Sequence, residues 1–286
     1  MSAQMDDPKA TLICWLVVNT ASGSHSAEAV QQVVSGLSKS GHAPQRIIRL
    51  PGEKLPERAE LEAAGVTLLV TFAGDGTANS QITRLHDWAG QLLVLPGGTQ
   101  NLLAKRLHGA ASAEQILAAL ADGWLEPRRL SMIRTAHGDA LCEIVAGPGA
   151  TWSDVRQMLR GRDVAALATK LAEAIRQSAG GPAVCVVEPA LGKPAGYPAI
   201  RLSPQDELMA VDGYCAEGLA DYARQSVAIL RRNFRQGPHD ELGTYAQVLC
   251  RSHQPIELMI DGERATGSAE ERFITALCPV EFLALV

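Results

Sequence analysis

Two glycine-rich segments, each placed after an apolar run, are the residues of this chain best suited to chemistry. Phe72-Ala73-Gly74-Asp75-Gly76-Thr77 follows the apolar residues 66–71, and Leu95-Pro96-Gly97-Gly98-Thr99 comes later in the chain. Ligands of open α/β sheets bind at the carboxyl ends of the strands, where glycines let backbone N–H groups come close to phosphate oxygens. Each segment alone also fits a tight turn between a strand and a helix. Their joint occurrence favours a phosphate-binding site.

Asp75 adds a carboxylate to the first of these loops. A carboxylate would repel a bare phosphate, so Asp75 is interpreted as a residue that handles Mg²⁺ or orders its water shell. Thr77 can cap the helix that follows and can also offer its hydroxyl group to a phosphate. This combination of groups indicates kinase-like chemistry.

Two further motifs are more ambiguous. The segment Asn19-Thr20-Ala21-Ser22-Gly23 follows the first apolar run and can hold an anion at a helix N-terminus, although an ordinary polar turn is the better explanation of this segment taken alone. The segment Asp261-Gly262-Glu263 is typical of a type I′ hairpin turn. It also offers Glu263 or Asp261 as a general base, and a hairpin tip can present such a carboxylate.

Composition limits the classes of function. The net charge of −5 and the pI of about 5.8 argue against nucleic-acid binding through a broad basic surface. The 6 cysteines have neither zinc-ligand nor disulfide-framework spacing, which favours a reducing cytoplasm. The polar residues 1–9 do not resemble a signal peptide, and no apolar run reaches the ~18 residues of a membrane span. Any membrane contact is therefore expected to be peripheral.

The expected elements divide the 286 residues into two domains of different type. Residues 1–125 alternate between strands and helices, which predicts a small doubly wound α/β domain. Residues 126–286 are mostly strand-like, with helices expected at 152–177 and 219–234, which predicts a β-rich, sandwich-like domain. The strands of the first domain are expected at 11–18, 46–50, 66–72 and 91–95, and its helices at 24–38, 55–64, 78–85, 101–107 and 113–120.

Taken together, the four motifs resemble those of the diacylglycerol kinase catalytic domain family, the soluble bacterial lipid kinases related to sphingosine kinases. The family patterns N-P-x-S-G, G-G-D-G-T-x-N-E, P-x-G-T-x-N-D-F-A-R and D-G-E are similar to residues 19–23, 73–80, 96–105 and 261–263. The resemblance implies an N-terminal ATP-binding domain, a β-rich second domain, and a last strand that returns to the first domain.

The resemblance also assigns residues to the site. Glu263 would accept the proton of the attacking hydroxyl, with Asp261 and Asp75 as further catalytic carboxylates. The metal site of the family corresponds loosely to Asp206 and Glu207. The expected ATP-binding residues are Asn19, Ser22, Gly23, Gly74, Asp75, Gly76, Thr77, Asn79, Ser80, Gly98, Thr99 and Asn101.

This chain departs from the family pattern at several positions. Thr20 replaces a proline, and Ala73 replaces a glycine, which is a mild change. Ser80 and Leu102 replace a glutamate and an aspartate beside the expected phosphates. Because Mg²⁺ on ATP relies on nearby carboxylates to order its waters, these two changes are expected to weaken metal handling or turnover.

The sequence therefore predicts an ATP- and Mg²⁺-dependent kinase. The acceptor would be a hydroxyl of a lipid such as diacylglycerol or a sphingoid base, met at a membrane surface. A noncatalytic nucleotide- or lipid-binding protein of the same fold is the main alternative, favoured by Ser80 and Leu102. An NAD kinase is disfavoured, because that family does not combine the opening motif with D-G-E. The sequence leaves the lipid and the oligomeric state open, a homodimer included.

Overall fold

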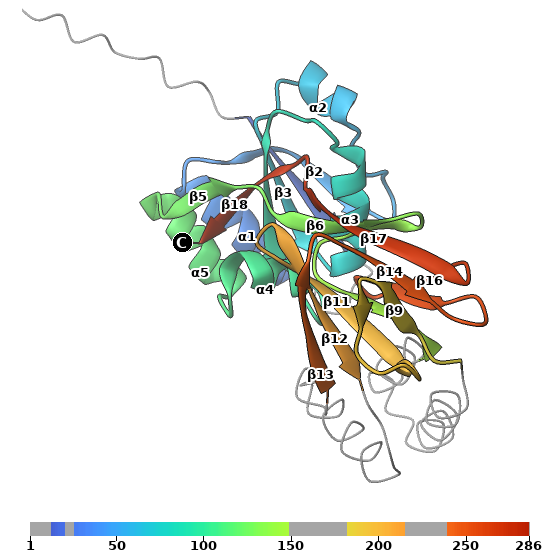
Figure 1. Cartoon of the computed structure of the whole chain (residues 1–286). Helices are drawn as coiled ribbons and strands as arrows, with labels where there is room; N and C mark the ends of the chain where they lie inside the picture. The colour runs from blue at the N-terminus through green and yellow to red at the C-terminus, as the bar shows by residue number, and fades with distance from the viewer. Residues whose placement is uncertain (1–12, 21–25, 149–181, 215–238, 286) are drawn as a thin grey trace, which may run out of the picture. The chain divides into compact units, whose positions relative to one another are not determined.

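The computed structural model describes residues 13–20, 26–148, 182–214 and 239–285, which fall into two compact units (Figure 1). The first unit comprises residues 1–129 and 279–286, and the second comprises residues 130–278. The expected boundary at residue 126 falls inside strand β5 (Leu125–Arg128), whose pairing in the first sheet keeps it in the first unit. The helices expected at 152–177 and 219–234 lie outside the described residues.

The first unit is built on a six-stranded sheet with the order β2-β1-β3-β4-β18-β5. All neighbours pair in parallel except β18 and β5, which are antiparallel. Its central strands are buried along nearly their whole length, as expected for a parallel sheet that is covered on both faces. The strands are β1 (Cys14–Asn19), β2 (Pro44–Leu50), β3 (Leu68–Ala73), β4 (Gln91–Pro96), β5 and β18 (Glu281–Leu285).

Helices cover both faces of this sheet, so the predicted doubly wound fold is confirmed. On one face α1 and α5 pack through Val33, Leu37 and Ile116 against alternate residues of β1, β3 and β4. Helices α3 and α4 contact β3 and β4 and belong to the other face. Helix α1 begins after Ser26, whose hydroxyl accepts the Ala29 N–H. The helices are α1 (Ala27–Lys39), α2 (Arg58–Ala63), α3 (Asp75–Arg84), α4 (Leu102–His108) and α5 (Ala113–Asp122).

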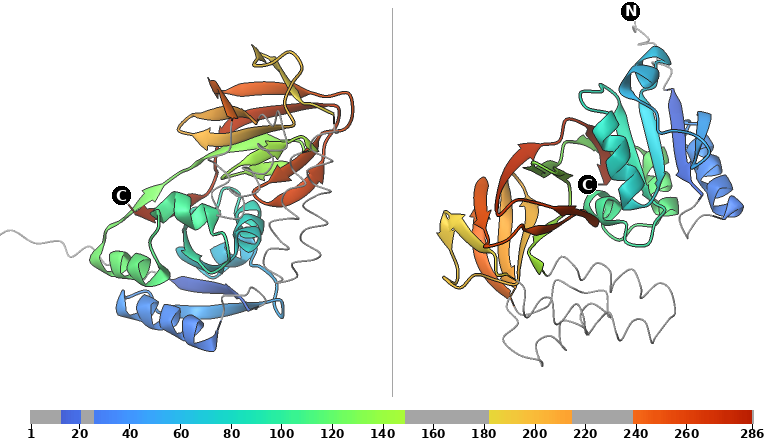
Figure 2. Two further views of the ribbon diagram at one scale, coloured as in Figure 1. Left: turned by 90° about the horizontal axis from the view of Figure 1, so that it is seen from below. Right: turned by 90° about the vertical axis from the view of Figure 1, so that its right-hand side faces the viewer.

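The last strand belongs to the sheet of the first unit. β18 pairs in parallel with β4 and antiparallel with β5, and in Figures 1 and 2 this red strand lies beside green β5. His108, at the end of α4, ties the strand to its neighbours. Its Nε2–H donates to the Val94 carbonyl at 3.1 Å, and its Nδ1 accepts the Leu285 N–H at 3.4 Å. The neutral imidazole therefore joins α4, β4 and β18.

His108 is expected to make the stability of the first unit depend on pH. Burial lowers the pKa of His108 to about 4, whereas an unfolded histidine titrates near 6.5. Unfolding takes up a proton between these two values, so stability is full above pH 6.5 and falls as the pH drops toward 4. The free energy of unfolding falls by up to about 3 kcal/mol over this pH range. Urea denaturation from pH 7.5 to 4 measures it.

His108→Gln removes the titrating group and is expected to flatten this pH dependence, although it lowers stability at neutral pH. His86→Gln, which changes an exposed histidine of the same unit, should leave the slope unchanged. A slope that is the same in wild type and His108→Gln would contradict the assignment.

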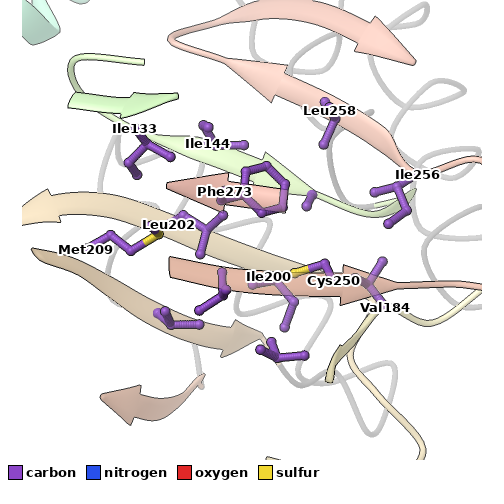
Figure 3. Close-up of a cluster of buried hydrophobic side chains, with 14 of the residues drawn as sticks. Ile133, Ile144, Val184, Ile200, Leu202, Met209, Cys250, Ile256, Leu258 and Phe273 are labelled. Atoms are coloured by element: carbon purple, nitrogen blue, oxygen red, sulfur yellow. The ribbon is translucent and has the colours of Figure 1, made fainter. Parts of the chain in front are cut away.

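The second unit is a sandwich of two antiparallel six-stranded sheets, as the sequence predicted. The sheet orders are β10-β9-β14-β17-β6-β7 and β13-β12-β11-β8-β15-β16. One buried cluster contains Phe273 and Cys250 from the first of these sheets and Ile200 and Leu258 from the second (Figure 3). The strands are β6 (Ser131–Thr135), β7 (Gly138–Ala140), β8 (Ile144–Ala146), β9 (Cys185–Glu188), β10 (Ala190–Leu191), β11 (Ala199–Gln205), β12 (Leu208–Tyr214), β13 (His239–Tyr245), β14 (Gln247–Arg251), β15 (Glu257–Ile260), β16 (Glu263–Thr266) and β17 (Glu270–Leu277).

Within the described part of the chain, no helix combines the length and the apolar character needed to cross a membrane.

Candidate functional site

Three loops of the first unit follow the adjacent strands β1, β3 and β4 at their carboxyl ends. The chain runs from β1 outward to β2 and then returns to β3 on the other side of β1, so the strand order reverses between β1 and β3. Such a switch point is where open α/β sheets bind ligands. The Asn19 amide, after β1, donates to the Thr77 hydroxyl, after β3, at 3.0 Å. This bond joins two of the predicted motifs directly.

The loops after β3 and β4 are in close contact through glycines. A Cβ atom placed on Gly98 would lie 2.5 Å from the Cα of Gly74, which no real side chain tolerates. Asn101 fixes the shape of the second loop: its Oδ1 accepts the Gly98 N–H at 2.7 Å, and its Nδ2 donates to the Gly98 carbonyl at 2.9 Å. Asn101 has a positive φ of 53°, a conformation that asparagine adopts more readily than most residues. Glycine at position 98 is therefore required by packing alone.

Asp75 links the same two loops. It is the first residue of α3, and its Oδ1 accepts the Leu103 N–H at 3.2 Å across 28 residues of sequence. Burial raises the pKa of the Asp75 carboxyl, while hydrogen bonds from the backbone of Leu103, Leu102 and Asn101 act in the opposite direction. The carboxylate thus caps the N-terminus of α4, where a negative charge is favourable.

The remaining predicted nucleotide-binding residues surround this junction. Gly76, Thr77, Asn79 and Ser80 lie in α3, which starts at Asp75 and not at the expected residue 78. The first N–H groups of a helix have no intrahelical acceptor, so the start of α3 can donate to an anion. Ser80 is exposed and Asn79 is half-buried, and Thr99 is exposed in the loop after β4. Ser22 and Gly23 lie outside the described residues.

The D-G-E motif forms the predicted type I′ turn, between β15 and β16 of the second unit. Asp261 and Gly262 have positive φ values of 47° and 93°, and Ile260 pairs with Glu263 across the hairpin. Glu263 is exposed and is the first residue of β16, a strand at the edge of its sheet. Its carboxylate is therefore accessible to a substrate hydroxyl.

Asp261 occupies a very different environment from Glu263. The residue is only 4% exposed, and its carboxylate accepts the N–H groups of Leu141, Cys142 and Glu143 at 2.7, 2.8 and 2.8 Å. Its own N–H donates to the Glu143 carbonyl at 3.0 Å. Burial raises the pKa of the Asp261 carboxyl, and the three N–H donors offset part of the rise. This geometry favours a positioning role for Asp261 over direct proton transfer.

Within the described residues, the expected metal positions are not part of a cluster of metal-binding side chains. Asp206 and Glu207 form the exposed turn between β11 and β12, and Asp206 has a positive φ of 50°. Among the described residues, no group of three or more His, Cys, Asp or Glu side chains could hold a metal ion. The Asp75 carboxylate already accepts backbone hydrogen bonds. The assignment of Asp206 and Glu207 stays a prediction.

Sequence reasoning missed a buried polar group on one face of the sheet that carries the D-G-E hairpin. Arg201 of β11 pairs with Asp212 of β12, with Nη2 and Oδ2 3.0 Å apart. Glu143, beside Asp261, is also buried. Burial raises the pKa of the Tyr214 hydroxyl, and the negative charge of Glu143 adds to this rise. Charged residues at alternate positions of otherwise apolar strands were the available signal.

The first unit is a Rossmann-like α/β domain whose glycine loops meet at the switch point of its sheet. Residues 14–133 match the family model described as the diacylglycerol kinase catalytic domain. The predicted resemblance is therefore confirmed, and it supports a kinase-type enzyme with a lipid-kinase-like function. No curated protein matches the sequence.

Solved structures agree on the fold. The crystal structure of a diacylglycerol kinase from Bacillus anthracis str. Sterne aligns with a TM-score of 0.60 and 12% identity, covering 96% of this chain and 98% of that one. A second structure from the same strain, provisionally assigned to the same class, aligns with a TM-score of 0.60 and 12% identity over 95% and 97%. At this identity the likeness extends to the fold alone.

Proposed function

We propose that this chain is an ATP-dependent lipid kinase that transfers the γ-phosphoryl group of ATP to a hydroxyl of a lipid such as diacylglycerol or a sphingoid base. The observation that carries the proposal is the junction of three loops at the switch point, within a domain that matches the diacylglycerol kinase catalytic family. Kinases of this family use ATP as the phosphate donor. The first N–H groups of α3 and the hydroxyl of Thr77 are the donors for the phosphates.

Glu263 is the proposed general base. Its exposed carboxylate takes the proton from the acceptor hydroxyl as the oxygen attacks the γ-phosphorus. The bond between the γ-phosphorus and the bridging oxygen breaks, and ADP leaves with that oxygen. Glu263 belongs to a hairpin that Asp261 attaches to the backbone of segment 141–143 through hydrogen bonds. The lipid is met by peripheral membrane contact. The net charge of −5 argues against action on nucleic acid, and the 6 cysteines without disulfide-framework spacing favour a reducing cytoplasm.

A noncatalytic nucleotide- or lipid-binding protein is the second candidate. Ser80 and Leu102 favour it, because both stand beside the phosphate loops where the family pattern has carboxylates.

A transfer assay separates the two candidates. The full chain is incubated with γ-labelled ATP, MgCl₂ and vesicles of a mixed lipid extract, and label in the extracted lipid is expected if the chain is a kinase. ATP labelled at the α-phosphate is the matched control and should leave the lipid unlabelled. ATP binding without labelled lipid would support the binding protein instead. Chromatography of the labelled product identifies the acceptor class.

A further inference from the structure

The strongest unexplained feature of the nucleotide site is how its one central carboxylate is used. Asp75 lies between the two glycine loops, yet its carboxylate is largely buried and accepts the N–H groups at the start of α4. Through these bonds it holds the loop after β4 against the start of α3. A carboxylate that already accepts backbone N–H groups has less capacity left to order the water shell of a metal ion.

The other side chains of the described loops supply no second carboxylate. Asn19 and Thr77 contribute an amide and a hydroxyl, and Asn101 is bonded to Gly98. Ser80 is exposed on α3, and Leu102 contributes only its N–H to Asp75. These groups can donate hydrogen bonds to phosphate oxygens, whereas a magnesium ion that a protein holds is usually bound through one or two carboxylates together with substrate phosphates.

We propose that Asp75 is a positioning residue that locks the two phosphate loops together, and that this site binds the ATP polyphosphate without a magnesium ion held by the protein. The inference rests on the proposed function, because it concerns the ATP site of the same enzyme. N–H and hydroxyl donors bind phosphate oxygens whether or not the ATP carries its own magnesium. Free ATP and Mg·ATP therefore bind with similar affinity.

Calorimetric titration of the full chain with ATP, once with excess MgCl₂ and once with EDTA, tests the proposal. The two dissociation constants for wild type are expected to agree within about threefold. Asp75→Asn keeps the shape of the side chain but replaces one acceptor oxygen with a donor, so it should weaken ATP about tenfold or more under both conditions. Asp87→Asn makes the same change at an exposed aspartate of the same unit, so it is the matched control and should change neither constant.

Two further measurements separate positioning of the phosphate loops from general damage to the fold. Adenosine lacks phosphates, so Asp75→Asn should leave adenosine affinity unchanged while ATP affinity falls. The double variant Ser80→Glu, Leu102→Asp adds two carboxylates beside the loops, and it is expected to make ATP binding depend on magnesium.

The outcomes distinguish this inference from the proposed function. If magnesium strengthens ATP binding by wild type tenfold or more, and Asp75→Asn removes only that gain, Asp75 handles the metal and the inference is overturned while the kinase proposal stands. If wild type binds ATP under neither condition, the proposed function and the inference fail together. Equal loss of adenosine and ATP affinity in Asp75→Asn would overturn the positioning role.

Discussion

Replacing Glu263 with glutamine is expected to reduce phosphoryl transfer by about 10²–10⁴-fold, the usual contribution of a positioned general base. The amide cannot accept the proton of the attacking hydroxyl. Glutamine fits the same exposed position at the start of β16, and the backbone pairing of Ile260 with residue 263 does not involve the side chain. ATP affinity and the unfolding temperature should therefore stay nearly unchanged. Initial rates at saturating ATP and lipid, calorimetric ATP titration and thermal melts measure the three quantities.

Glu257→Gln is the matched control for this variant. Glu257 is an exposed glutamate on the same hairpin, at the opposite end of β15, where its carboxylate accepts a hydrogen bond from Thr266. Its replacement should leave the transfer rate unchanged. A Glu263→Gln enzyme that transfers phosphate as fast as wild type would show that another group takes the proton.

The sequence predicted the central strands well and some of the edge strands poorly. Strands such as β3 and β4 are buried on both faces, so they are continuous apolar runs that can be recognised without the fold. Strands β5 and β10 and most of β13, which it did not predict, lie at the edges of their sheets. An edge strand such as β13, with the sequence HDELGTY, has little apolar pattern, and its pairing with β12 depends on the folded sheet.

In the candidate site, the sequence predicted which residues take part but not which hydrogen-bond partners they have. The glycine loops and the D-G-E turn were predicted from residue types at particular points of the chain. The structural roles of Asp75 and Asp261 were not predicted, because each carboxylate accepts hydrogen bonds from backbone N–H groups far away in the sequence. Leu103 is 28 residues from Asp75, and Leu141 is 120 residues from Asp261. Helix α3 also begins earlier than expected, since its first turn includes Gly76, a residue that favours loops when read by sequence alone.

Asp261→Ala is expected to destabilise the second unit by at least about 3 kcal/mol, because three buried N–H groups lose a charged acceptor. The Asp261 carboxylate accepts hydrogen bonds from the backbone N–H groups of Leu141, Cys142 and Glu143. The substitution leaves these N–H groups facing an apolar methyl group. Alanine also has to adopt the positive φ of 47° at this position, which costs about 1–2 kcal/mol. Urea denaturation followed by circular dichroism measures the free energy of unfolding.

Two further variants separate these contributions. Asp206→Ala carries the same backbone cost at the exposed β11–β12 turn, where φ is 50°, but removes no buried acceptor, so it should lose only about 1–2 kcal/mol. Asp261→Gly relieves the backbone strain and keeps the unpaired N–H groups, and it should remain destabilised. If Asp261→Ala and Asp206→Ala are equally stable relative to wild type, the buried carboxylate does not hold segment 141–143 in place. In that case Asp261 would be released from its positioning role and would again be a candidate for direct proton transfer.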